Sequence, residues 1–180
     1  MKAIQKDDLT KTDWSFGYQP ALTVKLDAHA GDFDQALINE ITLWKVNRYP
    51  IVDADVLCDL NEIRKTDKCF SRPKVRRLLL RLLDCHGIQL PMASTFLRFK
   101  NPALFQIIDQ RAYRAVYGKE LDLPGSYNQS GRKRLATIYI AYLRELRKKC
   151  VELGIPFEQS DRILYNADKR INKDAKLANY

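Results

Sequence analysis

Most of this 180-residue chain carries hydrophobic residues at intervals of three and four, the spacing of one face of an α-helix. Strand-like alternation of polar and apolar residues is nearly absent. Together with residues that commonly cap helices, the pattern predicts seven helices. They cover about residues 33–46, 53–63, 71–87, 91–99, 109–118, 130–153 and 160–173. We therefore expect an all-α fold, a single compact helical domain of about seven helices.

The expected helix ends rest on capping residues. Asp32 precedes the first helix and can accept a hydrogen bond from its free backbone N–H groups. Pro73 falls in the first turn of the third helix, where a proline is tolerated. Gly87 follows that helix and can take the left-handed conformation that ends many helices.

The first 31 residues do not follow the helical pattern. Gly17, Pro20 and Gly31 interrupt them, and only residues 23–26 read as a short strand or arm. We expect residues 1–31 to form an irregular or partly extended N-terminal arm. Residues 32–180 then form the helical domain.

The composition is that of a soluble globular protein, with 46% hydrophobic and 29% charged residues. The chain has 31 Lys and Arg residues and 22 Asp and Glu residues, which gives a net charge of +9. This balance favours a polyanionic partner, most simply nucleic acid. A basic surface that only keeps the protein soluble is the alternative.

Other features limit the cofactors and the compartment. The four cysteines show no C-x-x-C spacing and the chain has two histidines, so we expect no metal and no cofactor. The first ten residues are polar and charged, unlike a signal peptide, and no apolar run approaches a membrane span. We expect a monomer in the cytoplasm that binds no membrane, associated with the nucleoid if the source is bacterial.

One segment carries candidate chemistry. It consists of a turn at Gly87, an apolar helix to Phe99, and Asp109 at the start of the next helix. A tight turn between two helices can present backbone N–H groups to a phosphate. In a basic protein, this turn and the acid after it indicate contact with DNA beside a carboxylate that can stabilise positive charge. The alternative for Asp109 is a simple N-cap, and both roles can coexist.

The segment resembles the helix-hairpin-helix DNA glycosylase superfamily. Members of that superfamily have a Leu-Pro-Gly-Val-Gly-type hairpin, a following helix that contains an alanine, and a later catalytic aspartate. When residues 85–89 are matched to the hairpin, Ala93 falls on the alanine and Asp109 on the aspartate. The resemblance is clearest over residues 71–118 and includes the hairpin at 85–93. It implies that the protein binds double-stranded DNA, flips out a base and uses Asp109 at the sugar.

The resemblance also implies differences from some members. The lysine with which bifunctional members form a Schiff base is Pro91 here, so the resemblance implies a monofunctional enzyme without lyase activity. The second hairpin glycine is Gln89, which alters the turn. The cysteine cluster that holds iron and sulfur in some relatives is missing, so we expect no iron–sulfur cluster.

Further residues are candidates for contacts with DNA or with the excised base. The expected DNA contacts are His86, Gly87, Ile88 and Gln89 in the hairpin, together with Arg77, Lys133 and Arg134. Lys133 and Arg134 stand at a helix start, where the helix dipole disfavours cations and a phosphate would compensate them. Trp44 and Tyr113 are candidates for the substrate pocket, although their helical spacing also fits residues of the core.

The leading hypothesis is a monofunctional DNA N-glycosylase. The first alternative is a DNA-binding module on the same scaffold that has lost its chemistry, which Gln89 and Pro91 favour. A second alternative is a protein-interaction domain whose basic face meets an acidic partner. The sequence does not identify the base.

Overall fold

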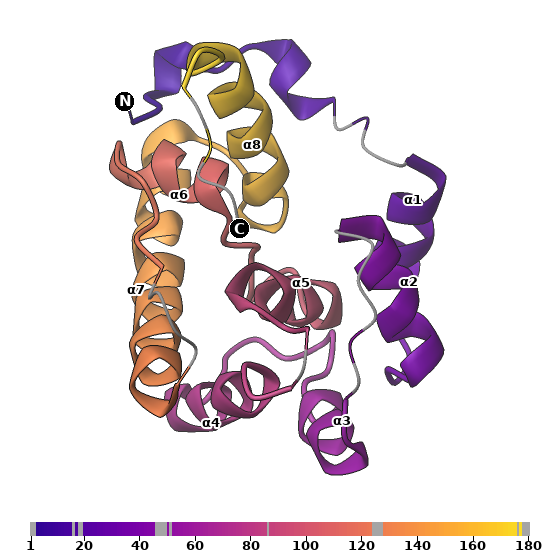
Figure 1. Ribbon diagram of the computed structural model, residues 1–180. Helices are drawn as coiled ribbons and strands as arrows, with labels where there is room; N and C mark the ends of the chain where they lie inside the picture. Colours follow the sequence, from indigo (N-terminus) through magenta and orange to yellow (C-terminus); the bar gives the residue numbers. More distant parts are fainter. Residues whose placement is uncertain are drawn as a thin grey trace.

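The computed structural model describes residues 3–15, 17, 20–45, 50, 52–85, 87–123, 128–175 and 177. Over these residues the protein is all-helical and forms one domain (Figure 1), and no described residue belongs to a strand. The eight described α-helices are α1 (Pro20–Ala28), α2 (Gln35–Lys45), α3 (Ala54–Asn61), α4 (Arg72–Leu82), α5 (Leu90–Lys100), α6 (Gln110–Tyr117), α7 (Gln129–Leu153) and α8 (Ser160–Ile171). Three short 3-10 helices accompany them: η1 (Lys6–Asp8), η2 (Lys11–Trp14) and η3 (Phe157–Gln159).

Helix α5 lies at the centre of the fold, with α2, α3 and α7 packed against it (Figure 1). All eleven of its residues are buried. Apolar side chains cover most of its circumference, and its polar residues find partners inside. The hydroxyls of Ser94 and Thr95, for example, both donate to the carbonyl of Pro91 at 2.8 Å. A helix that is buried all round needs such internal partners, because water cannot reach its polar groups.

Two helix pairs enclose this centre. Helix α6 packs on α8, and α4 packs on α7 (Figure 1). Helix α6 ends at Gly118, whose φ of +68° is the left-handed conformation that closes a helix, and α7 ends at Gly154 with a φ of +66°. Gly87 has a φ of +79°, as predicted for the turn after α4.

The prediction of an irregular or partly extended arm over residues 1–31 is wrong for much of that segment. Residues Pro20–Ala28 form helix α1 instead of a strand, and η1 and η2 precede it. Ile4 is fully buried and its backbone N–H donates to the carbonyl of Ala115 in α6 at 3.0 Å. Leu26 of α1 is also buried. The N-terminal residues therefore pack as part of the core.

The predicted start of the first helix was also wrong. Helix α2 begins at Gln35, and the Asp34 carboxylate accepts a hydrogen bond from the backbone N–H of Leu37 at 2.8 Å. Asp32 instead forms an ion pair with Arg64 at 2.7 Å. The other six predicted helices are present, and the largest difference is at α4, which ends at Leu82 and not near residue 87.

Candidate functional site

Asp109 caps the N-terminus of α6. One carboxylate oxygen, Oδ1, accepts a hydrogen bond from the backbone N–H of Ala112 at 2.7 Å. The other oxygen, Oδ2, lies 3.7 Å from the Lys45 ammonium at the end of α2. The Asp109 and Lys45 side chains are 17% and 18% exposed. Asp109 is thus an N-cap, as its sequence context indicates, and it also forms an ion pair that sequence spacing did not reveal.

The backbone that leads into Asp109 is held from both sides. Tyr139 and Tyr142 of α7 donate their hydroxyl hydrogen bonds to the carbonyls of Gln106 and Ile107 at 3.0 and 2.9 Å. From α5, the hydroxyl of Ser94 accepts the backbone N–H of Ile108 at 3.1 Å. Burial raises the pKa of both tyrosines well above 10, so their hydroxyls stay protonated donors at neutral pH. These bonds fix the position of Asp109 relative to the core.

Two cavities meet at Asp109. The larger, of about 240 Å³, is walled by the turn residues Gly87 and Gln89, by Pro91, and by Tyr165 of α8. The smaller, of about 150 Å³, lies on the side of Trp44 and is also lined by Tyr165. Lys45 and Asp109 line both. The structure therefore brings the predicted acid and the predicted turn together around one space.

The remaining hairpin residues do not all face that space. Ile88 is buried, with 3% of its surface exposed, and its backbone N–H donates to the carbonyl of Cys85 at 3.2 Å. Its side chain belongs to the core, so the prediction that Ile88 contacts DNA is wrong for this side chain. His86 lies outside the described residues.

The two aromatic candidates for a substrate pocket have different surroundings. Trp44 is 3% exposed, donates its indole N–H to the Thr23 hydroxyl at 2.6 Å and packs edge-on against Phe99, yet it lines the smaller cavity. Tyr113 points elsewhere, because its ring packs against Tyr117 and Tyr142. Neither cavity at Asp109 has Tyr113 in its walls.

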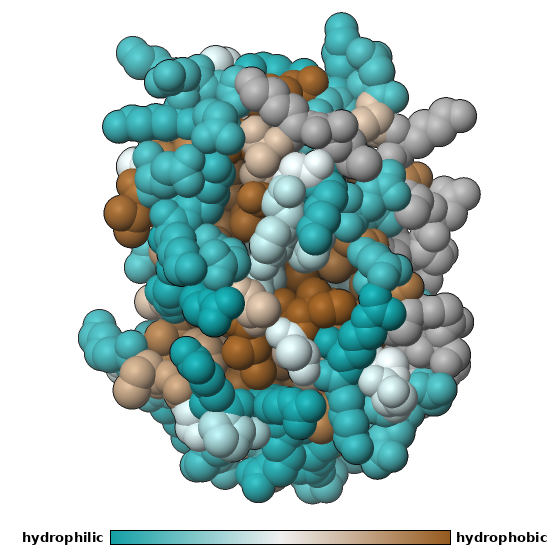
Figure 2. All heavy atoms as spheres, turned by 90° about the vertical axis from the view of Figure 1, so that its left-hand side faces the viewer, coloured by the Kyte–Doolittle hydropathy of each residue, from teal (hydrophilic) through white to brown (hydrophobic). Residues whose placement is uncertain are grey.

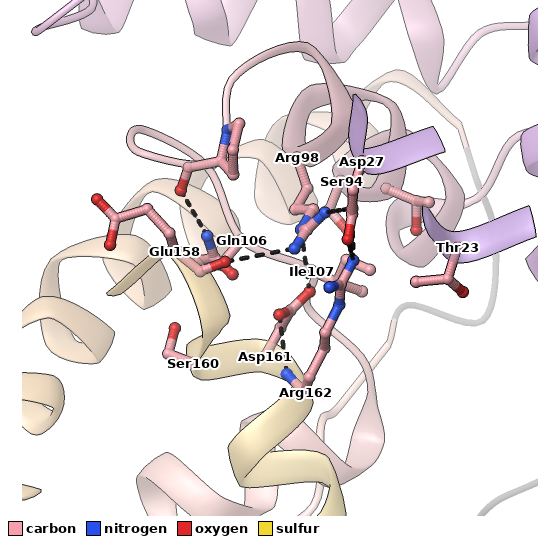
Figure 3. A network of polar contacts seen from close by, with 12 residues as sticks. Thr23, Asp27, Ser94, Arg98, Gln106, Ile107, Glu158, Ser160, Asp161 and Arg162 are labelled. Carbon is pink, nitrogen blue, oxygen red and sulfur yellow. Dashed lines mark hydrogen bonds and ion pairs between the residues drawn. The ribbon is translucent and has the colours of Figure 1, made fainter. Parts of the chain in front are cut away.

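A buried polar network lies behind the smaller cavity and joins α1, α5 and α8 (Figure 3). Arg98 and Arg162 both pair with Asp27, and Arg98 lies 3.6 Å from the carboxylate of Asp161. Asp161 is 4% exposed and also accepts the backbone N–H of Arg162 at 2.8 Å. Asp161 and Arg162 line the cavity that contains Asp109. The network therefore fixes one wall of the candidate site through ion pairs.

The predicted basic DNA contacts fall into a separate region. Arg77 of α4 and Lys133 of α7 line one groove of about 780 Å³ between the two helices. Figure 2 faces the side of the molecule that carries α7, where apolar side chains show at the bottom of hollows between projecting hydrophilic ones. Arg134 lies outside this groove and forms an ion pair with Asp122.

Sequence reasoning missed Lys45 and Tyr165 as parts of the site. Each lies more than fifty residues from Asp109 in the chain, and only the packing of α2 and α8 brings them to it. The tyrosine is also in contact with Arg111, whose guanidinium lies 5.6 Å from the centre of its ring. Arg111 itself donates a hydrogen bond to the carboxylate of Asp168 at 3.2 Å.

Within the described part of the chain, no group of three or more His, Cys, Asp or Glu side chains is arranged to hold a metal ion. Among the same residues, no helix has both the length and the apolar character needed to cross a membrane. No protein-family model, curated protein or solved structure matches this chain.

Proposed function

We propose that this protein binds duplex DNA and removes a base from it as a monofunctional DNA N-glycosylase, with Asp109 placed against the sugar. The observation that carries the proposal is the shared cavity. Asp109 at the start of α6 and the Gly87 turn, 22 positions earlier, line the same space of about 240 Å³. A turn that can hold a DNA phosphate and a carboxylate that can face the attached sugar are thus adjacent.

The chemistry requires such a carboxylate. Cleavage of an N-glycosidic bond builds positive, oxocarbenium-like charge on the deoxyribose. A fixed negative group beside C1′ stabilises that charge or orients the attacking water. Asp109 is held rigidly by its bond to Ala112 and by the hydrogen bonds from Tyr139 and Tyr142 to the preceding backbone. It therefore requires little reorganisation as the charge develops.

Binding to DNA is supported by charge and by the backbone of the turn. The net charge of +9 favours a polyanion. Gly87 adopts a positive φ of +79°, and successive N–H groups around such a residue can form a concave site for an anion. A base in a duplex lies inside the helical stack, so the target nucleotide has to rotate out to reach the cavity.

The reaction would use water as the nucleophile. Pro91 lines the cavity and stands at the position that matches the lysine of bifunctional helix-hairpin-helix glycosylases, and a proline side chain has no amine. Water attacks C1′ as the bond to the base breaks, and the departing base takes the electron pair and a proton. The products are a free base and an abasic site with its DNA strand intact.

The direct test is the release of free bases from damaged and phage-modified duplex DNA, measured by mass spectrometry. Wild type is compared with Asp109→Asn, and Asp34→Asn serves as the control. Asp34 also caps a helix through its carboxylate, but it lines neither cavity at Asp109. We expect release by wild type and by Asp34→Asn, and a rate at least about a hundredfold lower for Asp109→Asn. Equal rates for all three proteins would contradict the proposed role of Asp109.

A second candidate function is a DNA-binding module without catalysis. The observation in its favour is that both carboxylate oxygens of Asp109 have partners, Ala112 on one side and Lys45 on the other. A carboxylate already paired with an ammonium offers less charge to the sugar. This function predicts duplex binding that weakens steeply with salt and no free base from any substrate.

A further inference from the structure

The groove between α4 and α7 carries an unusual excess of cations. Four of its basic residues form no side-chain hydrogen bond or ion pair with another described residue: Arg72, Arg76, Arg77 and Lys133. All four are exposed. Their charges are therefore balanced only by solvent ions, which a polyanion can displace with a gain in entropy.

The other cations of the groove have acidic partners. Arg81 pairs with two aspartates of α3, Arg132 pairs with Asp84, and Arg144 pairs with Glu145. Asp84 is the one acidic residue among those that line the groove. The net positive charge of the groove therefore comes from Arg72, Arg76, Arg77 and Lys133.

The groove starts beside the turn at the candidate site. Asp84 and Arg132 form an ion pair at one end, and Asp84 precedes Gly87 by only three residues. Along α4 the lining residues run from Arg81 back to Arg72, about 14 Å at 1.5 Å per residue. A DNA strand rises about 3.4 Å per nucleotide, so this length corresponds to about four base pairs.

The lining of the groove indicates which part of a nucleic acid it would contact. Among the described residues that line it there is no Phe, Tyr or Trp, the residues whose flat rings stack on exposed bases. Arginine dominates its cations, and the guanidinium group binds phosphate in a bidentate fashion. The floor is formed by the aliphatic side chains of Leu80, Ile140 and Ala141, which suit the apolar faces of deoxyribose.

From these features we infer that the α4–α7 groove binds the sugar–phosphate backbone of one arm of a DNA duplex, on one side of the nucleotide held at Asp109. This inference rests on the proposed function only for the position of that nucleotide. The contact is independent of base sequence, because it is made to the backbone. The protein's footprint is therefore asymmetric about the target nucleotide.

The test uses two triple variants with the same change in charge. The groove variant is Arg76→Ala/Arg77→Ala/Lys133→Ala. The control variant, Lys25→Ala/Lys74→Ala/Lys148→Ala, removes three exposed cations that form ion pairs and lie outside the groove. The probes are three labelled duplexes with one stable abasic site. One has two long arms, and each of the others has one arm cut to about two base pairs, fewer than the groove spans. Affinity is measured by fluorescence anisotropy at increasing salt.

We expect wild type and the control variant to lose affinity when one particular arm is shortened and to tolerate the loss of the other. The groove variant should not distinguish the arms. A plot of log affinity against log salt concentration should have a less steep slope for the groove variant than for wild type. The difference should be about 2.7, because three phosphate contacts are lost and each contributes about 0.9. A fourfold rise in salt would then weaken wild-type binding about 40-fold more than it weakens binding by the groove variant.

Equal losses in both triple variants would overturn the inference, because total charge would then explain the binding. An unchanged affinity in the groove variant would overturn it too. If that variant had instead lost binding to an acidic helical peptide that wild type binds, the groove would be assigned to a protein partner. Groove-dependent binding without release of any base would contradict the proposed function and leave this inference standing.

Discussion

Helix α8 is joined to α6 by a buried ion pair, and breaking it should destabilise the protein strongly. Asp168 of α8 is fully buried. Its carboxylate accepts hydrogen bonds from Arg114 Nε at 2.8 Å and from Arg114 Nη2 at 2.6 Å. Arg111 and Asn172 donate two further bonds to it, at 3.2 and 2.9 Å. The variant Asp168→Asn keeps the shape of the side chain and removes its charge.

The size of the effect follows from the burial of the partner. Arg114 is 2% exposed, so without the Asp168 carboxylate its charge stays buried and loses the partner to which it donates two hydrogen bonds. The loss of one member of a buried pair typically costs about 3–5 kcal/mol. For a domain of this size each kcal/mol lowers Tm by about 2–4 °C. Asp168→Asn should therefore lower Tm by about 6–20 °C.

The measurement is thermal unfolding at pH 7, followed by circular dichroism. The control is Arg114→Met/Asp168→Leu, which removes both charges and keeps comparable volume. We expect this double variant to be at least as stable as Asp168→Asn, because it removes the buried guanidinium together with the carboxylate. If Asp168→Asn lowered Tm by less than about 2 °C, the pair would not stabilise the protein as proposed, because Arg114 would then be compensated by other groups.

Two further predictions concern the N-terminal residues and the helix ends. Burial raises the pKa of Asp13, but hydrogen bonds from Arg170 and Thr10 outweigh it, so the net pKa lies below 3.8 in the folded protein. The stability that Asp13 contributes is therefore full above about pH 4 and is lost as pH falls through the folded pKa. The difference in unfolding free energy between wild type and Asp13→Asn, from urea titrations, should shrink in that range, and a difference that is constant down to pH 2 would contradict it. Gly118→Ala should cost more stability than Gly154→Ala in the same titrations. Both positions have φ near +67°, which costs about 1–2 kcal/mol for alanine, but only at Gly118 would the new Cβ lie within 3.1 Å of another residue's backbone. Equal losses would contradict this.

Helix ends were the most predictable part of the fold because they depend on a few neighbouring residues. Pro73 in the first turn of α4 and Gly118 and Gly154 after α6 and α7 all have the positions that their conformational preferences require. Asp109 was predictable as an N-cap for the same reason. Its carboxylate meets the third N–H group of α6, as capping aspartates do.

Helix α1 was not predictable in this way. Its sequence has no clear apolar face, and Pro20 at its start resembles a break in the chain. The helix is supported by distant partners instead. The Thr23 hydroxyl accepts the indole N–H of Trp44, and Asp27 pairs with Arg98 and Arg162. Contacts of this kind depend on the tertiary fold and leave no local pattern.

The candidate site was predictable only where it is local in sequence. The Gly87 turn, α5 and Asp109 follow one another along the chain, so their spacing could be compared with a known motif. Lys45 and Tyr165 come from helices at opposite ends of the chain and gave no signal. Ile88 was expected to contact DNA because it lies in the turn, but its aliphatic side chain packs into the core instead.

We propose above that Asp109 stabilises positive charge on a deoxyribose. The most direct measurement compares two duplexes that differ at one position. One holds a neutral tetrahydrofuran abasic site, and the other holds a pyrrolidine ring whose protonated nitrogen mimics the charge of the transition state. An enzyme binds such a mimic more tightly than its neutral counterpart. We expect wild type to prefer the pyrrolidine duplex by at least about tenfold and Asp109→Asn not to distinguish the two. Equal affinity of wild type for both duplexes would contradict it.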